Sequence, residues 1–516
     1  MSFPPLTGLR CRDLICPWLA SGKANDMNKT ILIILTAFVL VLPKDAAAAA
    51  NPPPQAPKPN IVFFLVDDMG WKDLGCFGAK IYETPNIDKL CADGVKFTRA
   101  YTPISICSPA RASMMTGKHP MKLGMWAATH HIKKKDAVIL PGHLKQAGYQ
   151  TWHVGKWHMG QPGQRTLPEH LGFDVNIGGG QTWAPGSYWW PYDERHKGNP
   201  YIGVQKEFAK RGKKGDYLQD KLAEEAVGLI ANRDTRKPFF LNYWFYAVHE
   251  EHDGKPELVE KYKKKIAAAG LTPTYRFHPK TKTRICTSET DPVYAAMIES
   301  VDQSVGRVVE ALKKNGTYAN TLFLFYSDNG PTTTCAPLAG GKTSNYEGGI
   351  REPAFAVWHG HVKPGSRYDK TVYLPDLFDT ILEAAHVEIP KNHDGDGVSW
   401  FPVFAGKELP PRKLYYYFPL GNAGRGGVPG AALIDDATGM KYILNISGYG
   451  DELFHLGTDI GEDHNLIKEK PAIAADMEKD LRGFLRKYYP QQPPPAKSVD
   501  DAFRQRLGLA EPDPAK

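Results

Sequence analysis

The segment Asn60-Ile-Val-Phe-Phe-Leu-Val-Asp-Asp-Met-Gly70 decides the fold class of this chain. Its residues from Ile61 to Val66 are all apolar, and most belong to the types that favour strands. A strand with one face in water would alternate apolar and polar residues, whereas an unbroken apolar run requires cover on both faces. The segment therefore predicts a buried strand of a parallel sheet, followed at once by Asp67 and Asp68.

Further strands of the same sheet are predicted at residues 149–154, 238–248 and 321–326. Between them, residues 217–231 and 292–313 carry apolar side chains at spacings of three and four, which is typical of helices with one buried face. Strands that alternate with helices predict a doubly wound α/β sheet, which we assign to residues 60–390.

The pattern changes from about Lys391. Short, glycine-punctuated aromatic strands at 415–418 and 440–444 are followed by a helical pattern at 472–488. These features predict a second, smaller α+β domain over residues 391–490. The tail, residues 491–516, is rich in proline and charge and is predicted to be at least partly disordered.

The beginning of the chain has the pattern of a secretory leader. Lys29 precedes an apolar run at residues 31–42, and alanines at 46–50 offer a cleavage site. This run is too short to cross a bilayer core of about 30 Å. We therefore predict a leader over residues 1–50 with a signal peptide at about 27–50, a linker at 51–59, and a periplasmic or secreted protein without a membrane anchor. Whether translation begins at Met1 or Met27 is left open.

Charge and cysteine content allow several interpretations. The formal charge is +8, and residues 1–50 contribute five basic and three acidic residues (+2), which leaves +6. This modest excess suits a polyanionic substrate or an ordinary soluble surface, and no nucleic-acid partner is predicted. Outside the leader the cysteines are Cys76, Cys91, Cys107, Cys286 and Cys335. In an oxidising compartment an odd number indicates one thiol with a separate role, although buried free thiols explain it equally well; the pairing stays open.

Two predicted strands end in residues that are suited to bind a metal. Asp67 and Asp68 follow one strand, and Asp328 and Asn329 follow another. If these strands are parallel, the four side chains lie at one edge of the sheet, where three carboxylates would repel one another without a cation. Their donor atoms are oxygens, which hard divalent ions prefer. The sequence therefore predicts one divalent metal, Ca²⁺ first and Mg²⁺ as the alternative.

The segment Cys107-Ser-Pro-Ala-Arg-Ala-Ser-Met-Met-Thr-Gly117 predicts an anion-binding helix. Pro109 favours the first helical turn, which places Cys107 at the N-terminus, where unpaired backbone amides attract anions. Arg111 lies four residues further along, on the same face, and its planar guanidinium suits a tetrahedral oxyanion.

This spacing, Cys-x-Pro-x-Arg with Thr-Gly four residues later, resembles the signature of the type I sulfatases in the alkaline-phosphatase-like superfamily. The resemblance implies a large, mixed, mostly parallel sheet sandwiched by helices, with a smaller C-terminal domain. It also implies that a formylglycine-generating maturation enzyme oxidises Cys107, which is itself a metal ligand in that form. One hydroxyl of the formylglycine hydrate then attacks sulfur, and the other expels the sulfate.

Other motifs resemble the family in the expected order. In Gly155-Lys-Trp-His158, alternation places Lys156 and His158 on one side, and the resemblance implies that they hold the hydrate and the sulfate. His249 resembles the histidine that contacts the bridging oxygen, and is the candidate general acid. Lys342 resembles the second sulfate-binding lysine. The stretches 451–456 and 462–466 resemble a C-terminal pattern that we interpret as structural.

Departures from the family's pattern concern the substrate. Glu250, Glu251 and His252 follow His249, where relatives often have a proline two residues after the histidine. With the stretches 126–135 and 183–190, they are candidate subsite residues for a sulfated saccharide, although a solvated acidic loop and core aromatics explain them as well.

Two rival functions remain at this stage. A phosphomonoester, phosphodiester or phosphonate-ester hydrolase would share the fold, but the two-metal phosphate enzymes need ligands for a second metal, and the sequence supplies one set. A non-catalytic binder of sulfated glycans would keep the basic pocket without needing an intact nucleophile.

Overall fold

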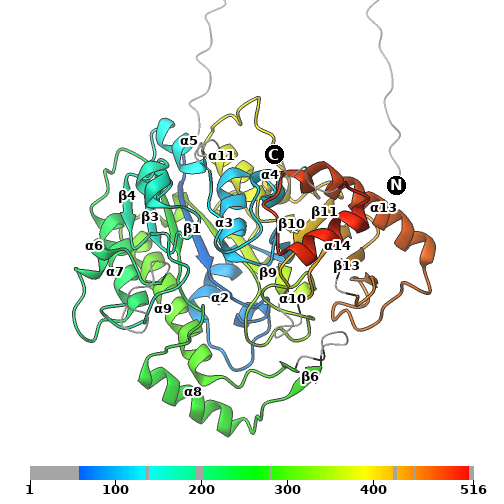
Figure 1. The fold of residues 1–516 in the computed structure, drawn as a ribbon. Helices are drawn as coiled ribbons and strands as arrows, with labels where there is room; N and C mark the ends of the chain where they lie inside the picture. Colours follow the sequence, from blue (N-terminus) through cyan, green and yellow to red (C-terminus); the bar gives the residue numbers. More distant parts are fainter. Residues whose placement is uncertain are drawn as a thin grey trace, which may run out of the picture. The chain divides into compact units, whose positions relative to one another are not determined.

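The computed structural model describes residues 57–133, 139–192, 202–277, 282, 284–421, 427–446 and 448–510. The predicted leader lies outside these residues. An eight-stranded sheet forms the centre of the unit that begins at Lys58 (Figure 1). In sheet order its strands are β10 (Ser366–Tyr373), β2 (Val95–Tyr101), β9 (Arg351–Val357), β8 (Thr321–Ser327), β1 (Asn60–Val66), β5 (Phe239–Trp244), β3 (Gln150–Gly155) and β4 (Val175–Ile177).

The sheet is mixed and mostly parallel, as predicted. Strand β1 pairs in parallel with β5 and β8, whereas β9 is antiparallel to both β8 and β2. Every residue of β1 is buried, which confirms that both faces of this strand are covered. The predicted strand at 238–248 is shorter than expected, because β5 leaves the sheet after Trp244.

Helices cover both faces of the sheet. Ile61, Phe63 and Leu65 of β1 face a core that includes α3 (Cys107–Thr116), α5 (Leu140–Gln146) and α11 (Asp376–Ala384). Val62, Phe64 and Val66 face a second core with α2 (Pro85–Ala92), α7 (Leu218–Ala231) and α9 (Pro292–Lys314). Helix α8 (Pro256–Ala268) packs against α9. Smaller elements are α4 (Pro120–Leu123), α6 (Lys206–Ala209), α10 (Glu347–Ile350), α12 (Phe401–Phe404) and the hairpin of β6 (Tyr275–Phe277) and β7 (Arg284–Cys286).

A small antiparallel sheet forms the predicted C-terminal α+β region. It contains β11 (Lys413–Phe418), β12 (Gly430–Asp435), β13 (Met440–Asn445) and β14 (Glu452–His455), followed by α13 (Pro471–Tyr488). Its side chains join one of the two large cores, and the boundary near residue 390 stays a prediction.

The prediction of a disordered tail is wrong for residues 497–507. They form α14 (Lys497–Leu507), whose Phe503 and Leu507 are fully buried. The apolar residues Val499, Phe503 and Leu507 recur every four positions, and this spacing is the helical signal that composition alone concealed. None of the described helices combines the length and the apolar character needed to cross a membrane.

Candidate active site

The ends of β1 and β8 bring the predicted metal ligands together. The two strands run parallel in register, with Val66 opposite Ser327, so Asp67 and Asp328 leave the same edge of the sheet. The backbone N–H of Asp68 donates to Asp328 Oδ1 at 3.2 Å, and Asn329 Nδ2 donates to Asp68 Oδ1 at 2.6 Å. Ser327, which sequence reasoning missed, also links the strand ends, because its Oγ accepts from the N–H of Met69 at 3.0 Å. The sequence feature that could have identified Ser327 is a polar residue at the end of an apolar strand.

Cys107 is the first residue of α3, as predicted. The helix ends at Gly117, whose φ of 68° suits glycine. Cys107 is 1% exposed, and its sulfur and carboxylate oxygens of Asp67 and Asp328 all lie within 4.8 Å of one another. Burial raises the pKa of the Cys107 thiol, and Asp67 adds to the rise, against the lowering effect of Lys156 and Lys342. An unmodified Cys107 is therefore a neutral thiol and a poor nucleophile.

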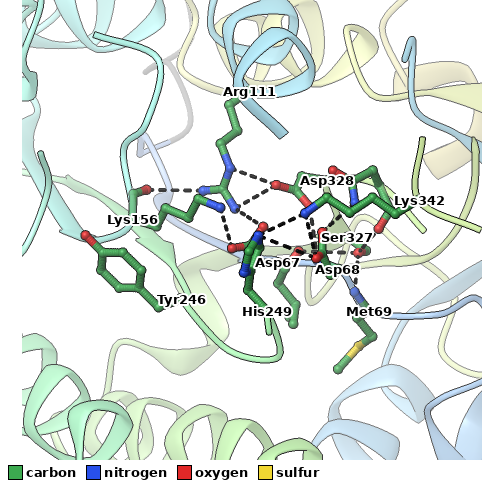
Figure 2. A network of polar contacts seen from close by, with 12 residues as sticks. Asp67, Asp68, Met69, Arg111, Lys156, Tyr246, His249, Ser327, Asp328 and Lys342 are labelled. Atoms are coloured by element: carbon green, nitrogen blue, oxygen red, sulfur yellow. Dashed lines mark hydrogen bonds and ion pairs between the residues drawn. The ribbon is translucent and has the colours of Figure 1, made fainter. Parts of the chain in front are cut away.

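Three buried cations neutralise the carboxylates (Figure 2). Arg111 contacts Asp328 Oδ2 at 2.8 Å and Asp67 Oδ1 at 3.3 Å, and Lys156 Nζ donates to Asp67 Oδ2 at 2.5 Å. Lys342 Nζ donates to Asp68 Oδ2 at 2.7 Å. Positive side chains from distant parts of the chain thus meet at one acidic centre.

His249 completes this centre. Its Nε2 lies 2.9 Å from Lys342 Nζ and 3.7 Å from Asp68 Oδ2, and the hydroxyl of Tyr188 donates to its carbonyl oxygen at 2.9 Å. Burial and then the nearby charge of Lys342 lower the pKa of His249 to about 3. The imidazole is therefore neutral at neutral pH, with its Nε2 placed to accept from Lys342, and it can act as an acid only after it takes up a second proton. Tyr188 lies in the predicted 183–190 stretch, but its role in supporting His249 is visible only in the structure.

The acidic groups differ in their proton affinity. Burial raises the pKa of Asp328 to about 7, with Asp67 adding to the rise and Arg111 opposing it. Burial would also raise the pKa of Asp68, but the charges of Lys342, His249 and Lys156 outweigh it and hold this pKa well below its usual range. An additional positive charge would consequently stabilise the ionised form of Asp328 more than that of Asp68.

Two buried oxygens at this centre lack a well-aligned hydrogen-bond donor. Asn329 Oδ1 has no donor among the residues that the structure describes, and Asp67 Oδ1 has only the ion pair with Arg111 at 3.3 Å. Buried acceptors are usually satisfied, so these oxygens mark a position for a cation. Together with Asp68 and Asp328 they form an all-oxygen donor set of the kind that hard divalent ions prefer. The residues present fit a divalent metal.

The segment after β3 departs from regular strand geometry. Gly155 has a φ of 99° and His158 a φ of 66°, so the expected alternation does not apply there. Lys156 still reaches Asp67, and His158 is fully buried with its ring 6.4 Å from that of Trp183. Burial, followed by the charges of Lys156 and Arg111, lowers the pKa of His158 well below its usual value. Neither ring nitrogen of His158 has a hydrogen-bond partner among the described residues, which leaves both for a ligand.

A pocket of about 220 Å³ adjoins the buried centre. Its lining includes Trp183, His249, Glu250 and Glu251, which places three candidate subsite residues beside His249. His252 is not part of this lining and lies 3.6 Å from Asp291.

The stretch 126–135 is described only as far as Lys133. Trp126 Nε1 donates to the carbonyl oxygen of Pro493, and the carbonyl oxygen of His130 accepts from Ser108 in α3. These contacts support the start of α3 and its surroundings, and neither residue lines the pocket beside His249.

The assembled centre can bind a tetrahedral oxyanion. Arg111, Lys156 and Lys342 supply positive charge, Cys107 lies beside Asp67 and Asp328, and His249 lines the adjoining pocket. Preorganised charges in a buried site stabilise charge that develops in a transition state far better than charges in water do.

Comparison with known proteins agrees with this chemistry. The sequence profile of the family described as Sulfatase matches residues 59–387. N-acetylgalactosamine-6-sulfatase of Rattus norvegicus is 32% identical over 430 residues, which cover 77% of this chain and 74% of that protein. Arylsulfatase A of Homo sapiens is 30% identical over 391 residues, which cover 70% of this chain and 70% of that protein. The crystal structure of Ps i-CgsB in complex with k-i-k-neocarrahexaose shares 30% sequence identity at a TM-score of 0.68, covering 83% of this chain and 93% of that chain.

The profile spans well over half of the chain, and both enzymes are matched over more than two thirds of their length. The family generally uses a metal and a formylglycine. This chain belongs to the sulfatase family of sulfuric ester hydrolases.

Proposed function

We propose that this protein hydrolyses sulfate monoesters of a sulfated saccharide, with a formylglycine made from Cys107 and one divalent metal. The observation that carries the proposal is the place of Cys107, buried at a helix N-terminus beside Asp67 and Asp328 and near three cations. A neutral thiol at this position is a weak nucleophile, and a thiosulfate ester would have no internal route of release. The hydrate of formylglycine supplies two hydroxyls, one to attack sulfur and one to expel the sulfate.

The metal would be held by Asp67, Asp68, Asp328, Asn329 and the oxidised residue 107. When bound it adds positive charge beside the sulfuryl oxygens. We assign Ca²⁺ first and Mg²⁺ second, because an all-oxygen set of ligands suits Ca²⁺, whose coordination geometry is the less demanding of the two.

The other side chains of the site have separate roles in the reaction. Arg111, Lys156 and Lys342 pair with the carboxylates and stabilise the sulfuryl oxygens, and His158 helps to hold the hydrate and the sulfate. His249, once it carries a second proton that the negative charge of the bound sulfate stabilises, gives that proton to the leaving oxygen, since it lines the pocket beyond Lys342. The negative charge that moves to that oxygen as the S–O bond breaks is then neutralised where it forms.

Mass spectrometry of the peptide that contains Cys107 tests the proposal directly. We expect the aldehyde form in active protein from a host that contains a formylglycine-generating maturation enzyme. Protein from a host without that enzyme should retain the thiol and lack activity. Full activity in a preparation whose Cys107 is entirely thiol would overturn the mechanism.

Replacing His249 by asparagine is expected to slow hydrolysis in proportion to how poor the leaving group is. For a saccharide sulfate we expect kcat to fall by about 10²–10⁴-fold, the range for loss of general acid catalysis. Nitrophenyl sulfate, whose phenolate needs no proton, should lose much less. The measurement is kcat for both substrates with both proteins, and equal losses would contradict the role of His249 as the acid.

Removing the metal by chelation is expected to abolish activity without unfolding the protein. Arg111, Lys156 and Lys342 already pair with the carboxylates, so the folded state does not depend on the metal. Restoring Ca²⁺ at 100 times its Kd should add about 2.7 kcal/mol to the free energy of unfolding. Calorimetry with Ca²⁺ and with Mg²⁺ identifies the preferred ion, and activity that survives exhaustive chelation would exclude a catalytic metal.

A saccharide as the substrate is supported by the pocket beside His249. It combines the aromatic face of Trp183 with carboxylates that can accept hydrogen bonds from hydroxyls. Hydrolysis should be measured over a panel of sulfated glycans, nitrophenyl sulfate and nitrophenyl phosphate. Activity on nitrophenyl sulfate alone would exclude the saccharide, and faster cleavage of the phosphate would favour the rival phosphate chemistry.

Export to the periplasm or the medium is the location that suits such a substrate. It rests on the leader pattern at residues 27–50, and fractionation of cells that express the full chain tests it.

A further inference from the structure

The loop that carries Lys342 joins two parts of the protein. It runs from the end of β8 to α10, and it delivers the Lys342 amine to Asp68 and His249. On the side of the active site, Lys342 N–H donates to the carbonyl oxygen of Pro331 at 2.9 Å and Thr343 N–H to that of Ser105 at 2.8 Å. The other end of the loop, at Tyr346 and Glu347, is held by a different part of the chain.

The C-terminal sheet packs on that end of the loop. Tyr346 and Ile350 belong to a hydrophobic cluster with side chains from one face of the small sheet. These side chains are Leu414, Tyr416, Ala432, Ile434, Ile443 and Phe454. The Tyr346 hydroxyl also donates to Glu452 of β14. Apolar packing of this kind brings the loop to the sheet but tolerates small sliding motions.

A fully buried ion cluster adds directional contacts at the same place. Lys441 of β13 lies 3.1 Å from Glu347 Oε1 and 2.8 Å from Glu462 Oε1. The other oxygen of Glu462 accepts the backbone N–H of Glu347 at 2.7 Å. Tyr101 and Arg351 contact Glu347 Oε2 at 2.9 and 3.3 Å, so both of its oxygens are engaged.

The burial of this cluster indicates what it does. Lys441 is 0% exposed and Glu462 is 2% exposed. A buried ion pair adds little net stability compared with apolar residues of the same size, and its best-attested use is to select one arrangement over others. Here the ion cluster fixes the position of the Glu347 backbone, which lies five residues after Lys342.

We propose that Lys441 and Glu462 are positioning residues for Lys342, an inference that rests on the proposed role of Lys342 in binding sulfate. They hold the end of the loop at Glu347 against the C-terminal sheet. The loop then places the Lys342 amine between Asp68 and His249. The small sheet is accordingly part of the catalytic apparatus through its hold on the backbone of Glu347.

A double-mutant cycle on kcat/KM tests this proposal with the metal-loaded, matured enzyme. The variants are Lys342→Ala, Lys441→Met and the combination of the two. We expect Lys342→Ala to lower kcat/KM by about 10²–10³-fold. Lys441→Met should lower it by about 10–100-fold through misplacement, with most of the loss in KM, because a displaced Lys342 weakens sulfate binding from the ground state onward.

The combination decides between positioning and a general structural role. If Lys441 acts through Lys342, the double variant is no worse than Lys342→Ala, because there is nothing left to position. Effects that multiply would overturn the proposal. If Lys342→Ala alone leaves kcat/KM unchanged, the proposed role of Lys342 fails. If Lys342→Ala lowers kcat/KM while Lys441→Met does not, only the positioning role fails.

Two controls keep the outcome independent of folding. Lys413→Met removes a lysine that pairs with Asp480 on the same small sheet, and it should leave kcat/KM unchanged. Glu462→Gln keeps an oxygen for the Glu347 N–H and should retain kcat/KM within a few fold, whereas Glu462→Ala should match Lys441→Met. If Lys441→Met does not fold, the glutamine and alanine variants decide alone, and equal activity in these two would overturn the proposal.

Discussion

Replacing Cys107 by alanine is expected to reduce kcat for every sulfate ester by roughly 10⁴–10⁶-fold, the range found when a nucleophile is removed from an enzyme. The variant loses the thiol whose oxidation gives the formylglycine aldehyde, and with it the hydrate that supplies the attacking hydroxyl, while Arg111, Lys156 and Lys342 stay in place to bind sulfate. We therefore expect substrate binding to persist. The measurement is kcat by single-turnover kinetics, combined with the Kd of a sulfated ligand by calorimetry.

Cys91→Ala is the matched control for that variant. Cys91 is also a buried cysteine, at 5% exposure in α2, and it lies in the core on the opposite face of the sheet from Cys107. Its replacement should cost some stability and leave kcat unchanged. A Cys107→Ala enzyme that retains wild-type hydrolysis would remove Cys107 from the mechanism altogether.

Replacing Arg111 by methionine is expected to produce the largest combined effect on stability and activity. Arg111 is fully buried and pairs with Asp328 and Asp67, so its loss leaves buried carboxylates uncompensated, at a cost of about 3–5 kcal/mol. The pKa of Asp328, already raised to about 7, should rise further, and the carboxyl should take up a proton unless a cation replaces the guanidinium. Activity should fall by about 10²–10³-fold, because one charge beside the sulfuryl oxygens is gone.

Added Ca²⁺ separates these two consequences. Because the ion binds the carboxylates that Arg111 left unpaired, it should restore part of the lost unfolding free energy but not the lost activity. Arg412→Met is the matched control: Arg412 pairs with buried Asp376 at 2.5 Å, so its loss should lower stability without any dependence on Ca²⁺ and with kcat of the folded protein unchanged. An Arg111→Met protein as stable as the wild type would show that the buried pairs contribute little.

Much of the site could be predicted from the sequence because its residues follow local patterns. The apolar run before Asp67 and Asp68 requires a buried parallel strand, and a second such strand precedes Asp328, so parallel pairing brings their ends together. Pro109 and Gly117 mark the two ends of α3, which places Cys107 at its N-terminus. The approach of His249 and Lys342 to this centre followed only from resemblance, since nothing local links positions 93 residues apart.

What could not be predicted depends on contacts without a local signal. Lys441 stands in an otherwise ordinary strand, and only the pairing of the small sheet shows that its amine is buried between Glu347 and Glu462. His252 was grouped with Glu250 and Glu251 by sequence position, yet it turns toward Asp291 instead of lining the pocket. Such contacts depend on how distant segments pack against one another, and the patterns of a single sequence do not encode this packing.

The 1% exposure of Cys107 also bears on the order of events in the biogenesis of the enzyme. The active site of a second protein cannot enclose a side chain that is buried beneath the ends of the central strands. If residue 107 becomes formylglycine as proposed, we expect its oxidation to precede folding, on a chain that is still extended. The proposed divalent ion needs only the finished site, whose carboxylates are already paired with Arg111, Lys156 and Lys342. The proposed order is therefore modification first, folding second and binding of the metal last.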